Sequence, residues 1–252
     1  MTAKSQPQNE RPLMTKSTKT VLVVEDEKDL AELICFNLQR EGFATRHADG
    51  GDLALEEIRR DPPDIILLDR MLPGMSGDEV AQECRRDPAT SAIPIIMLTA
   101  KAEESDELVG FALGADDYVT KPFSTKVLVA RVAAMLRRGE APVPDSEAMR
   151  EGPFSIDWNR HELKVGDIPI GVTATEFRLL GALMAASGKV LDRGTLIDKV
   201  LGHGAVVLDR TIDVHITSLR KKLAQADPAS DHAAWIQTIR GVGYSFRPPT
   251  AD

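Results

Sequence analysis

Long apolar stretches are missing from this chain of 252 residues. No run approaches the roughly 18 consecutive apolar residues that a membrane-spanning helix requires. The N-terminus also lacks the apolar centre of a secretory signal. These two absences argue against a membrane-embedded or secreted protein, and they predict a cytoplasmic one with no membrane partner.

Cysteine is scarce as well, and basic residues are fewer than acidic ones. The two cysteines, Cys35 and Cys84, each fall in a helix-like segment with no second cysteine nearby, which predicts buried, reduced thiols. The chain has 31 Lys and Arg against 39 Asp and Glu, for a net charge of −8. Because such a chain repels nucleic acid in bulk, this charge taken alone argues against nucleic-acid binding.

The composition, 42% apolar and 28% charged, allows one large domain or two of ordinary size. A polar N-terminal segment, in which Met14 is an alternative start, is expected to be disordered. A stretch rich in proline, glycine and charge interrupts the apolar pattern and is expected to be a linker. The predicted organisation is a tail over 1–19, a first domain over 20–138, a linker over 139–151 and a second domain over 152–248.

Short apolar runs alternate with helical periodicity throughout the first domain. The runs are VLVV (21–24), FATRH (43–47), DIILLD (64–69), PIIMLT (94–99) and DDYVT (116–120). The segments with helical spacing cover roughly 28–40, 51–60, 77–87, 103–113 and 125–138. Parallel strands need helical crossovers and are buried on both faces, so the pattern predicts an α/β domain with a doubly wound, five-stranded parallel sheet.

Polar side chains stand at the carboxyl ends of the predicted strands, where ligands bind in open α/β sheets. They are Glu25, Asp26, Asp69, Thr99 and Lys121. Three carboxylates in one crevice repel each other unless a cation neutralises them, and an all-oxygen set suits Mg²⁺. The sequence therefore predicts a magnesium site that handles a phosphoryl group.

Each member of this set has a predicted role. Asp69 is placed to be the nucleophile that forms an acyl phosphate. Lys121 and Mg²⁺ would neutralise the developing charge, and the Thr99 hydroxyl would donate to a phosphoryl oxygen. No glycine-rich phosphate loop follows any strand, which argues against a nucleotide site.

The second domain shows β-like pieces, then helical segments near 175–186, 192–200 and 209–225, then a strand pair around 235–238 and 244–247. This order predicts a small α+β domain. In the last helical segment the apolar residues Ile212, Ile216, Leu219 and Leu223 form a stripe, and Arg210, Thr217, Arg220, Lys221 and Lys222 fall largely outside it. This exposed basic face suits a major groove. Gly241 and Gly243 permit a tight hairpin turn that carries Arg240 toward a minor groove.

Four segments of the first domain resemble the receiver domain of two-component response regulators: VLVVEDE (21–27), DIILLDRMLPGMSG (64–77), PIIMLTA (94–100) and GADDYVTKPF (114–123). The resemblance implies phosphoryl transfer from a sensor histidine kinase to Asp69 and slow hydrolysis of the product, so the protein would be a regulator and not an enzyme. The implied metal ligands are Glu25, Asp26, Asp69 and the Met71 carbonyl. The implied phosphoryl-binding and switch residues are Thr99, Ala100, Lys121 and Tyr118, with a cis bond before Pro122.

Three segments of the second domain resemble the winged-helix effector domain of OmpR/PhoB-type regulators: TATEFRLLGALMA (173–185), LDRTIDVHITSLRKKL (208–223) and TIRGVGYSF (238–246). The expected DNA-binding residues are Arg210, His215, Thr217, Ser218, Arg220, Lys221, Thr238, Arg240 and Tyr244. The resemblance implies binding to double-stranded promoter DNA at direct repeats, contact with RNA polymerase, and a role in phosphate regulation. Residues 152–252 carry a net charge of +1 and the rest −9, so the acidity belongs to the first part of the chain.

The sequence departs from the phosphate-regulon members of this family at the expected DNA surface. Those members present two arginines where this chain has Thr217 and Ser218, so bidentate guanine readout is lost there and a different or weaker base preference is expected. Leu201 replaces a common tryptophan in the loop that meets RNA polymerase in the family, and Asp209 is expected to cap the following helix.

The resemblance also implies a homodimer that forms on phosphorylation. Its expected face comprises Leu108, Phe111, Asp117, Val127, Val129 and Arg131. Two charge pairs of the family are missing, since Glu107 and Val127 replace one and Ala112 and Ala133 replace the other. Exposed ion pairs contribute only about 0–1 kcal/mol, so their loss is expected to alter partner choice more than dimer stability.

Two other interpretations remain open. One is a free-standing Mg²⁺-dependent phosphatase that uses Asp69 covalently, although no cap segment is inserted to form a substrate pocket. The other is a phosphorylation-independent DNA-binding protein with a vestigial receiver. The intact set at the strand ends argues against the latter.

Overall fold

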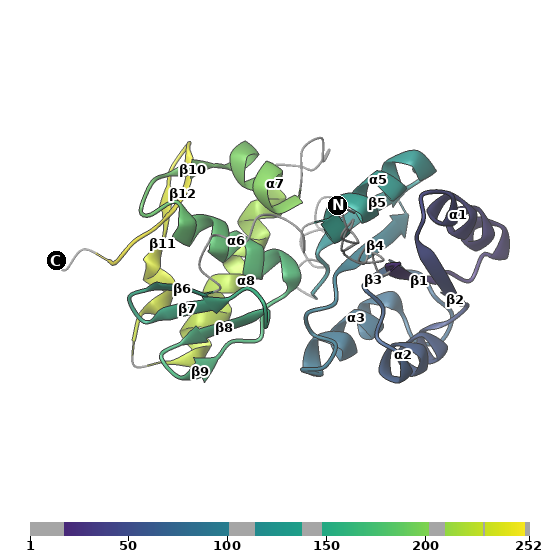
Figure 1. Ribbon diagram of the computed structural model, residues 1–252, viewed down its shortest axis with the longest axis horizontal. Helices are drawn as coiled ribbons and strands as arrows, with labels where there is room; N and C mark the ends of the chain where they lie inside the picture. The colour runs from purple at the N-terminus through teal and green to yellow at the C-terminus, as the bar shows by residue number, and fades with distance from the viewer. Residues whose placement is uncertain (1–17, 101–113, 138–147, 202–209, 229, 250–252) are drawn as a thin grey trace, which may run out of the picture.

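The structure is a computed structural model, and it describes residues 18–100, 114–137, 148–201, 210–228 and 230–249. Two domains follow each other along the chain, each with its own sheet and core (Figure 1). Within the described ranges, no helix is long and apolar enough to cross a membrane.

The first domain is a five-stranded parallel sheet in the order β2-β1-β3-β4-β5. Its elements are β1 (Thr20–Val24), α1 (Lys28–Arg40), β2 (Ala44–Ala48), α2 (Gly51–Arg60), β3 (Ile65–Asp69), α3 (Gly77–Arg86), β4 (Ile95–Ala100), β5 (Asp117–Lys121) and α5 (Thr125–Arg137). The predicted fold class is confirmed. The helix expected over 103–113 lies outside the described residues.

Alternation along the central strands supplies both faces of this sheet. Leu22 and Val24 of β1 face the cluster that α2 and α3 cover. Val21 and Val23 face the cluster that α1 and α5 cover. Because both faces are covered, the apolar runs are continuous and polar side chains stand only at their ends.

The second domain places two antiparallel sheets around three helices. Its elements are β6 (Ala148–Glu151), β7 (Phe154–Asp157), β8 (Glu162–Val165), β9 (Ile168–Pro169), α6 (Ala174–Ala185), β10 (Leu191–Asp192), α7 (Arg193–Leu201), α8 (Arg210–Ala226), the short 3-10 helix η2 (His232–Trp235), β11 (Ile236–Ile239) and β12 (Gly243–Phe246). The expected closing hairpin is β11 and β12, with Thr238 opposite Tyr244. Its turn contains Gly241 at φ +74°, a conformation that favours glycine.

One segment differs from the sequence-based expectation. Residues 148–151, assigned to the linker, form strand β6 and pair with β7. The segment AMRE has no strong apolar alternation, and backbone pairing with a neighbouring strand holds it in place, with Met149 packed against the core. The second domain therefore begins at least four residues earlier than residue 152.

Candidate functional site

The polar strand ends of the first domain converge as predicted. Glu25 follows β1, Asp69 ends β3 and Lys121 ends β5. The Nζ atom of Lys121 lies 2.7 Å from Oε2 of Glu25 and 2.6 Å from Oδ2 of Asp69. Residues that are 96 and 52 positions apart in sequence thus share one polar site at the edge of the sheet.

Three carboxylates gather there, and they are the candidate metal ligands. One oxygen each of Glu25, Asp26 and Asp69 lies within 4.8 Å of the others. Glu25 and Asp69 are buried and Asp26 is exposed. Their oxygens are the ligand type that Mg²⁺ prefers, and with the single ammonium of Lys121 they leave a net charge of about −2 that a divalent cation matches.

Burial and charge shift the pKa values of two groups in this site. Burial raises the pKa of Glu25, and the charge of Asp69 adds to the effect while Lys121 opposes it. Burial lowers the pKa of Lys121, but its hydrogen bonds to Asp69 and Glu25 outweigh burial and leave the pKa above its usual value. Lys121 is therefore held as a cation beside Asp69, the carboxylate predicted to be the nucleophile.

The backbone and hydroxyl groups around Asp69 complete the site. The N–H of Met71 donates to Oδ1 of Asp69 over 3.1 Å, and the side chain of Met71 is exposed. Thr99 is buried, and its hydroxyl donates to the carbonyl of Ala100 over 3.0 Å. The peptide bond between Lys121 and Pro122 is cis, as expected. Tyr118 is buried within the core cluster between the sheet and α2 and α3.

The predicted buried stripe of α8 is confirmed, since Ile212, Ile216, Leu219 and Leu223 are fully buried in the core of the second domain. On the other side of the helix Thr217 and Lys221 are exposed. Ser218 donates to Oε1 of Glu176 over 2.6 Å and so faces α6. The side chain of Arg210 lies outside the described part of the chain.

The candidate nucleic-acid residues near the hairpin form a connected polar network. Arg220 donates to the carbonyl of Ile236 and to Oγ1 of Thr238, the latter over 2.8 Å. The hydroxyl of Tyr244, a buried residue, donates to Oδ1 of Asp213 over 2.6 Å. Arg240 and Thr238 are exposed. The structure therefore brings α8 and the hairpin together on one surface.

His215 is an expected DNA-binding residue, but in this structure it lies at the contact between the two domains. Its side chain is 1% exposed, and it hydrogen-bonds with the backbone of Asp116 in the first domain. Burial lowers the pKa of this histidine. In this arrangement His215 belongs to the contact between the domains.

Comparison with known proteins identifies both domains. Residues 21–133 match the response regulator receiver domain, and residues 167–246 match the family described as transcriptional regulatory protein, C terminal. The chain belongs to the OmpR/PhoB-type response regulators.

The similarity to relatives extends over nearly the whole regulator. It is 46% identical over 230 residues to the sensory transduction protein RegX3 of Mycolicibacterium smegmatis, across 90% of this chain and 98% of that protein. It is 42% identical over 228 residues to the phosphate regulon transcriptional regulatory protein PhoB of Escherichia coli strain K12, across 90% and 97%. The solved structure of a RitR mutant matches with a TM-score of 0.75 and 28% identity, across 92% of this chain and all of that one.

Part of the expected dimer face of the regulator is described. Asp117 and Arg131 form an ion pair of 2.7 Å within the same chain. Val129 is buried and Val127 is 46% exposed. Leu108 and Phe111, like Glu107 and Ala112, lie outside the described residues.

The two cysteines differ more than the sequence suggested. Cys84 is buried, as expected, and burial raises the pKa of its thiol to about 11. Cys35 is only partly buried, so the expectation of a buried thiol is wrong in degree for this residue. Burial raises its pKa as well. Neither environment favours the reactive thiolate.

Sequence reasoning missed three residues of the regulator that join its domains or the helices of its second domain. Asp116 was included in a predicted strand, and it is a fully buried carboxylate at the domain contact. Arg178 lies in α6 and donates to a carbonyl of the first domain. Arg193, at the start of α7, donates to Asp213 over 2.7 Å beside the ring of Tyr244. The isolated charges inside apolar segments were the only available signal.

Proposed function

We propose that this protein is a cytoplasmic transcription regulator that a sensor histidine kinase activates through phosphorylation of Asp69. The observation that carries the proposal is the contact of Lys121 Nζ with Asp69 Oδ2, 2.6 Å, among the grouped carboxylates, in a chain that also has a winged-helix domain. A fixed ammonium beside the carboxylate partly neutralises the negative charge that a phosphoryl group brings to the site.

In the proposed reaction a carboxylate oxygen of Asp69 attacks the phosphorus of a phosphohistidine in the kinase. The new P–O bond forms as the P–N bond breaks, and the imidazole leaves with its electron pair. Lys121 neutralises charge on the phosphoryl oxygens, and the Thr99 hydroxyl and the N–H after Thr99, that of Ala100, donate to them. Mg²⁺ bound by Glu25, Asp26, Asp69 and the Met71 carbonyl would supply further charge neutralisation. Water later hydrolyses the acyl phosphate slowly, so the protein is a regulator and not an enzyme.

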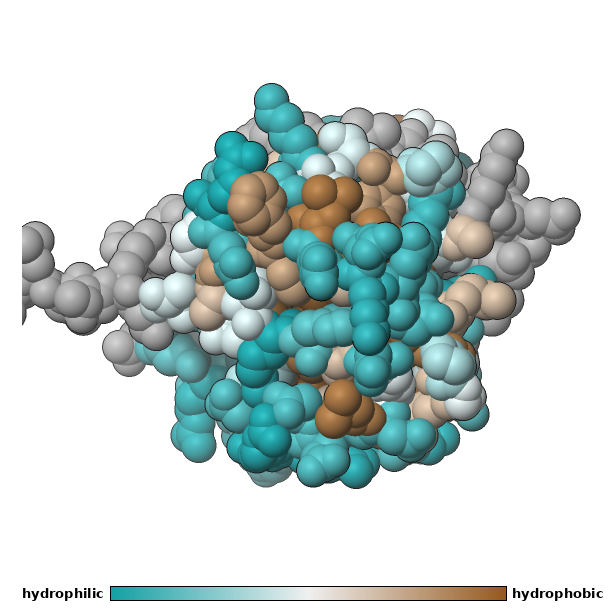
Figure 2. Space-filling view, turned by 90° about the vertical axis from the view of Figure 1, so that its right-hand side faces the viewer, coloured by the Kyte–Doolittle hydropathy of each residue, from teal (hydrophilic) through white to brown (hydrophobic). Residues whose placement is uncertain are grey.

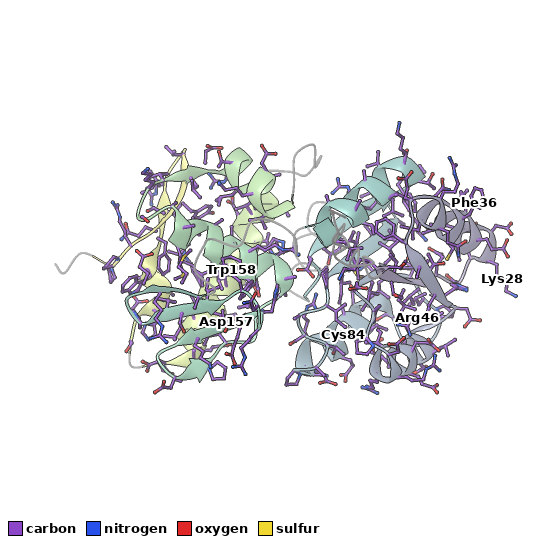
Figure 3. The ribbon with its side chains drawn as sticks, in the orientation of Figure 1. Lys28, Phe36, Arg46, Cys84, Asp157 and Trp158 are labelled. Carbon is purple, nitrogen blue, oxygen red and sulfur yellow. The ribbon has the colours of Figure 1, made fainter. Side chains whose placement is uncertain are left out.

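The first helix is the proposed contact for the kinase. Leu33 and Phe36 of α1 are 48% and 58% exposed. Figure 3 shows Phe36 and Lys28 on the outer side of α1. Figure 2, which views this end of the domain, shows separate apolar side chains surrounded by polar ones. Such a surface suits a transient protein contact better than a permanent one.

Phosphorylation is proposed to promote a homodimer through Val127, Val129, Asp117 and Arg131 together with Leu108 and Phe111. The dimer would bind direct repeats in promoter DNA through α8 and the hairpin. The proposed contacts come from Arg210, Thr217, Ser218, Arg220, Lys221, Thr238, Arg240 and Tyr244. His215 would join them when it leaves its contact with the first domain. RNA polymerase is the further partner. The similarity to PhoB, a phosphate regulon regulator, favours a role in phosphate regulation.

Selection of bound sequences from random double-stranded DNA, with and without beryllium fluoride as phosphoryl mimic and with Mg²⁺ present, tests the proposal. We expect the mimic to produce a dimer in analytical ultracentrifugation and to raise DNA affinity by about tenfold, a typical coupling between two sites. Asp69→Ala should remove both effects. Asp52→Asn, which changes an exposed carboxylate of α2, should keep them.

Two outcomes would contradict the proposal. If Asp69→Ala and the wild type bind the selected DNA equally in every condition, the receiver is vestigial. If the mimic leaves the protein monomeric, the proposed dimer face is wrong. A selected sequence that differs from the one bound by PhoB under the same conditions is expected, because Thr217 and Ser218 cannot form bidentate pairs with guanine.

A further inference from the structure

Thr217 is exposed on the side of α8 that is proposed to meet DNA, but its hydroxyl is engaged within the helix. The Oγ1 atom donates to the carbonyl of Asp213, four residues earlier, over 2.8 Å. Threonine side chains in helices form such bonds to the backbone of the preceding turn. The hydroxyl proton of Thr217 is therefore used inside the helix, and the γ-methyl is the group that this exposed side chain has left for a base.

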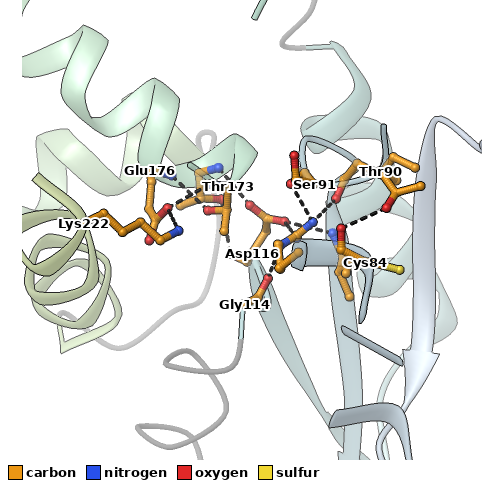
Figure 4. Close-up of polar contacts among 12 residues, drawn as sticks. Cys84, Thr90, Ser91, Gly114, Asp116, Thr173, Glu176 and Lys222 are labelled. Carbon is orange, nitrogen blue, oxygen red and sulfur yellow. Dashed lines mark hydrogen bonds and ion pairs between the residues drawn. The ribbon is translucent and has the colours of Figure 1, made fainter. Parts of the chain in front are cut away.

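The hydroxyl of the next residue, Ser218, is engaged as well. It donates to Oε1 of Glu176 over 2.6 Å. Glu176 is buried, and its Oε2 accepts from Nζ of Lys222 over 2.5 Å and from the N–H of Thr173 over 2.8 Å. Figure 4 shows Glu176 of α6 with Lys222, which comes from α8, and with Thr173. Loss of a donor to a buried carboxylate is costly, so the hydroxyl proton of Ser218 is held inside the domain.

Two neighbouring cations of α8, Arg220 and Lys221, differ in what they have left for DNA. Arg220 donates from both Nε and Nη2 to the carbonyl of Ile236, so this edge of its guanidinium faces the hairpin. Lys221 is exposed and follows Thr217 by four residues, which places both on one face of the helix. A lysine ammonium is a point charge that suits a phosphate, and phosphate contacts position a helix without reading sequence.

We propose that Thr217 selects a thymine, through contact of its γ-methyl with the C5-methyl group of that base in the major groove. The inference rests on the proposed function and names the base that this position of α8 reads. Thymine presents a methyl group in the major groove, whereas cytosine presents an amino donor and no methyl group. Apolar contact with the threonine γ-methyl therefore distinguishes the two pyrimidines without a hydrogen bond. Lys221 positions Thr217 by binding a phosphate one helical turn away.

Removal of single methyl groups from the selected DNA tests this contact in the full-length protein. Each thymine of one repeat is replaced in turn by uracil, which lacks only the C5-methyl group. Affinity is measured by fluorescence anisotropy at fixed salt, with Mg²⁺ and beryllium fluoride present. We expect one replacement to weaken binding of the wild type about fourfold, the effect of one methyl-sized group leaving an apolar contact. Cytosine at that position should also weaken binding, and 5-methylcytosine should bind more tightly than cytosine.

Two variants of Thr217 assign the effect to its methyl group. Thr217→Ser keeps the hydroxyl and loses the methyl, so it should bind the uracil and thymine forms of the site equally. Thr217→Val keeps a γ-methyl and loses the hydroxyl, so it should still bind the thymine form more tightly than the uracil form. Circular dichroism and thermal unfolding would establish that both variants fold.

Three outcomes would overturn the inference. In the first, no replacement of thymine by uracil weakens binding of the wild type. In the second, folded Thr217→Ser discriminates against uracil as strongly as the wild type, so the methyl contact belongs to another residue. In the third, folded Thr217→Val binds both forms equally, so the hydroxyl carries the contact.

The same measurements separate failure of this inference from failure of the proposed function. If the wild type binds the selected DNA more tightly with the phosphoryl mimic, and Asp69→Ala does not, the proposed function stands even where uracil has no effect, and the thymine contact alone is wrong. If no sequence is selected in any condition, the proposed function is wrong and the thymine contact fails with it.

Discussion

At the scale of single residues, the proposed phosphoryl site has more carboxylates than cations. Glu25 and Asp69 are buried and share one cation, Lys121. Asp26 is exposed, although one of its oxygens lies within 4.8 Å of theirs. Because Asp26 is not needed to hold the other two side chains, it is the member whose removal tests cation binding with the least effect on the fold.

We predict that Asp26→Asn removes the stabilisation of the protein by Mg²⁺. A ligand that binds only the folded state at ten times its Kd stabilises that state by about 1.4 kcal/mol. For a domain of this size the melting temperature should rise by about 5 °C. Differential scanning calorimetry of the wild type with and without Mg²⁺ should show this rise, and Asp26→Asn should not.

Glu27→Gln is the matched control for this measurement. Glu27 is an exposed carboxylate next to the cluster, and it is not part of it. The Mg²⁺ response of Glu27→Gln should therefore equal that of the wild type. An equal response of Asp26→Asn would show that the cation binds elsewhere.

At the scale of elements, the same N-terminal motif begins one helix in each domain. Ser76 and Glu79 form a capping box at the start of α3, and Thr173 and Glu176 form one at the start of α6. Glu79, in the capping box of α3, is exposed, whereas Glu176, in the capping box of α6, is buried. Glu176 also accepts from Ser218 over 2.6 Å and from Lys222 over 2.5 Å. One carboxylate therefore joins α6 to the proposed recognition helix (Figure 4).

We predict that Glu176→Ala destabilises the second domain by about 3 kcal/mol, because it removes the cap and leaves buried polar partners unsatisfied. Both tryptophans, Trp158 and Trp235, lie in this domain, so their fluorescence during urea unfolding reports on it alone. Glu79→Ala, followed by circular dichroism, should lower the stability of the first domain far less. Equal losses would mean that the link from Glu176 to α8 contributes nothing beyond the cap.

The same elements show how far sequence reasoning reaches. The strands that end at Asp69 and Lys121 could be predicted, because a strand buried on both faces needs a continuous apolar run and its end is marked by charge. Strand β6 could not, since AMRE is held by pairing and not by its own pattern. Asp116 could not either, because its partner Thr175 is 59 residues away in another domain. Local periodicity indicates the helix or strand to which a residue belongs and which face of it is buried. It carries no signal about contacts between domains.

At the scale of the whole molecule, the net negative charge belongs to the first part of the chain. The second domain is almost neutral, so its net charge attracts DNA only weakly. The proposed affinity for DNA therefore depends on a few placed cations and on dimerisation.

The proposed dimerisation on phosphorylation predicts a reciprocal effect of DNA on the receiver. If the phosphoryl mimic raises DNA affinity by a given factor, the selected DNA must raise affinity for the mimic by the same factor, because the coupling free energy between two sites is shared. Titration of beryllium fluoride in the presence of Mg²⁺, with and without saturating DNA, measures it. Equal affinity for the mimic with and without DNA would show that the receiver does not control DNA binding.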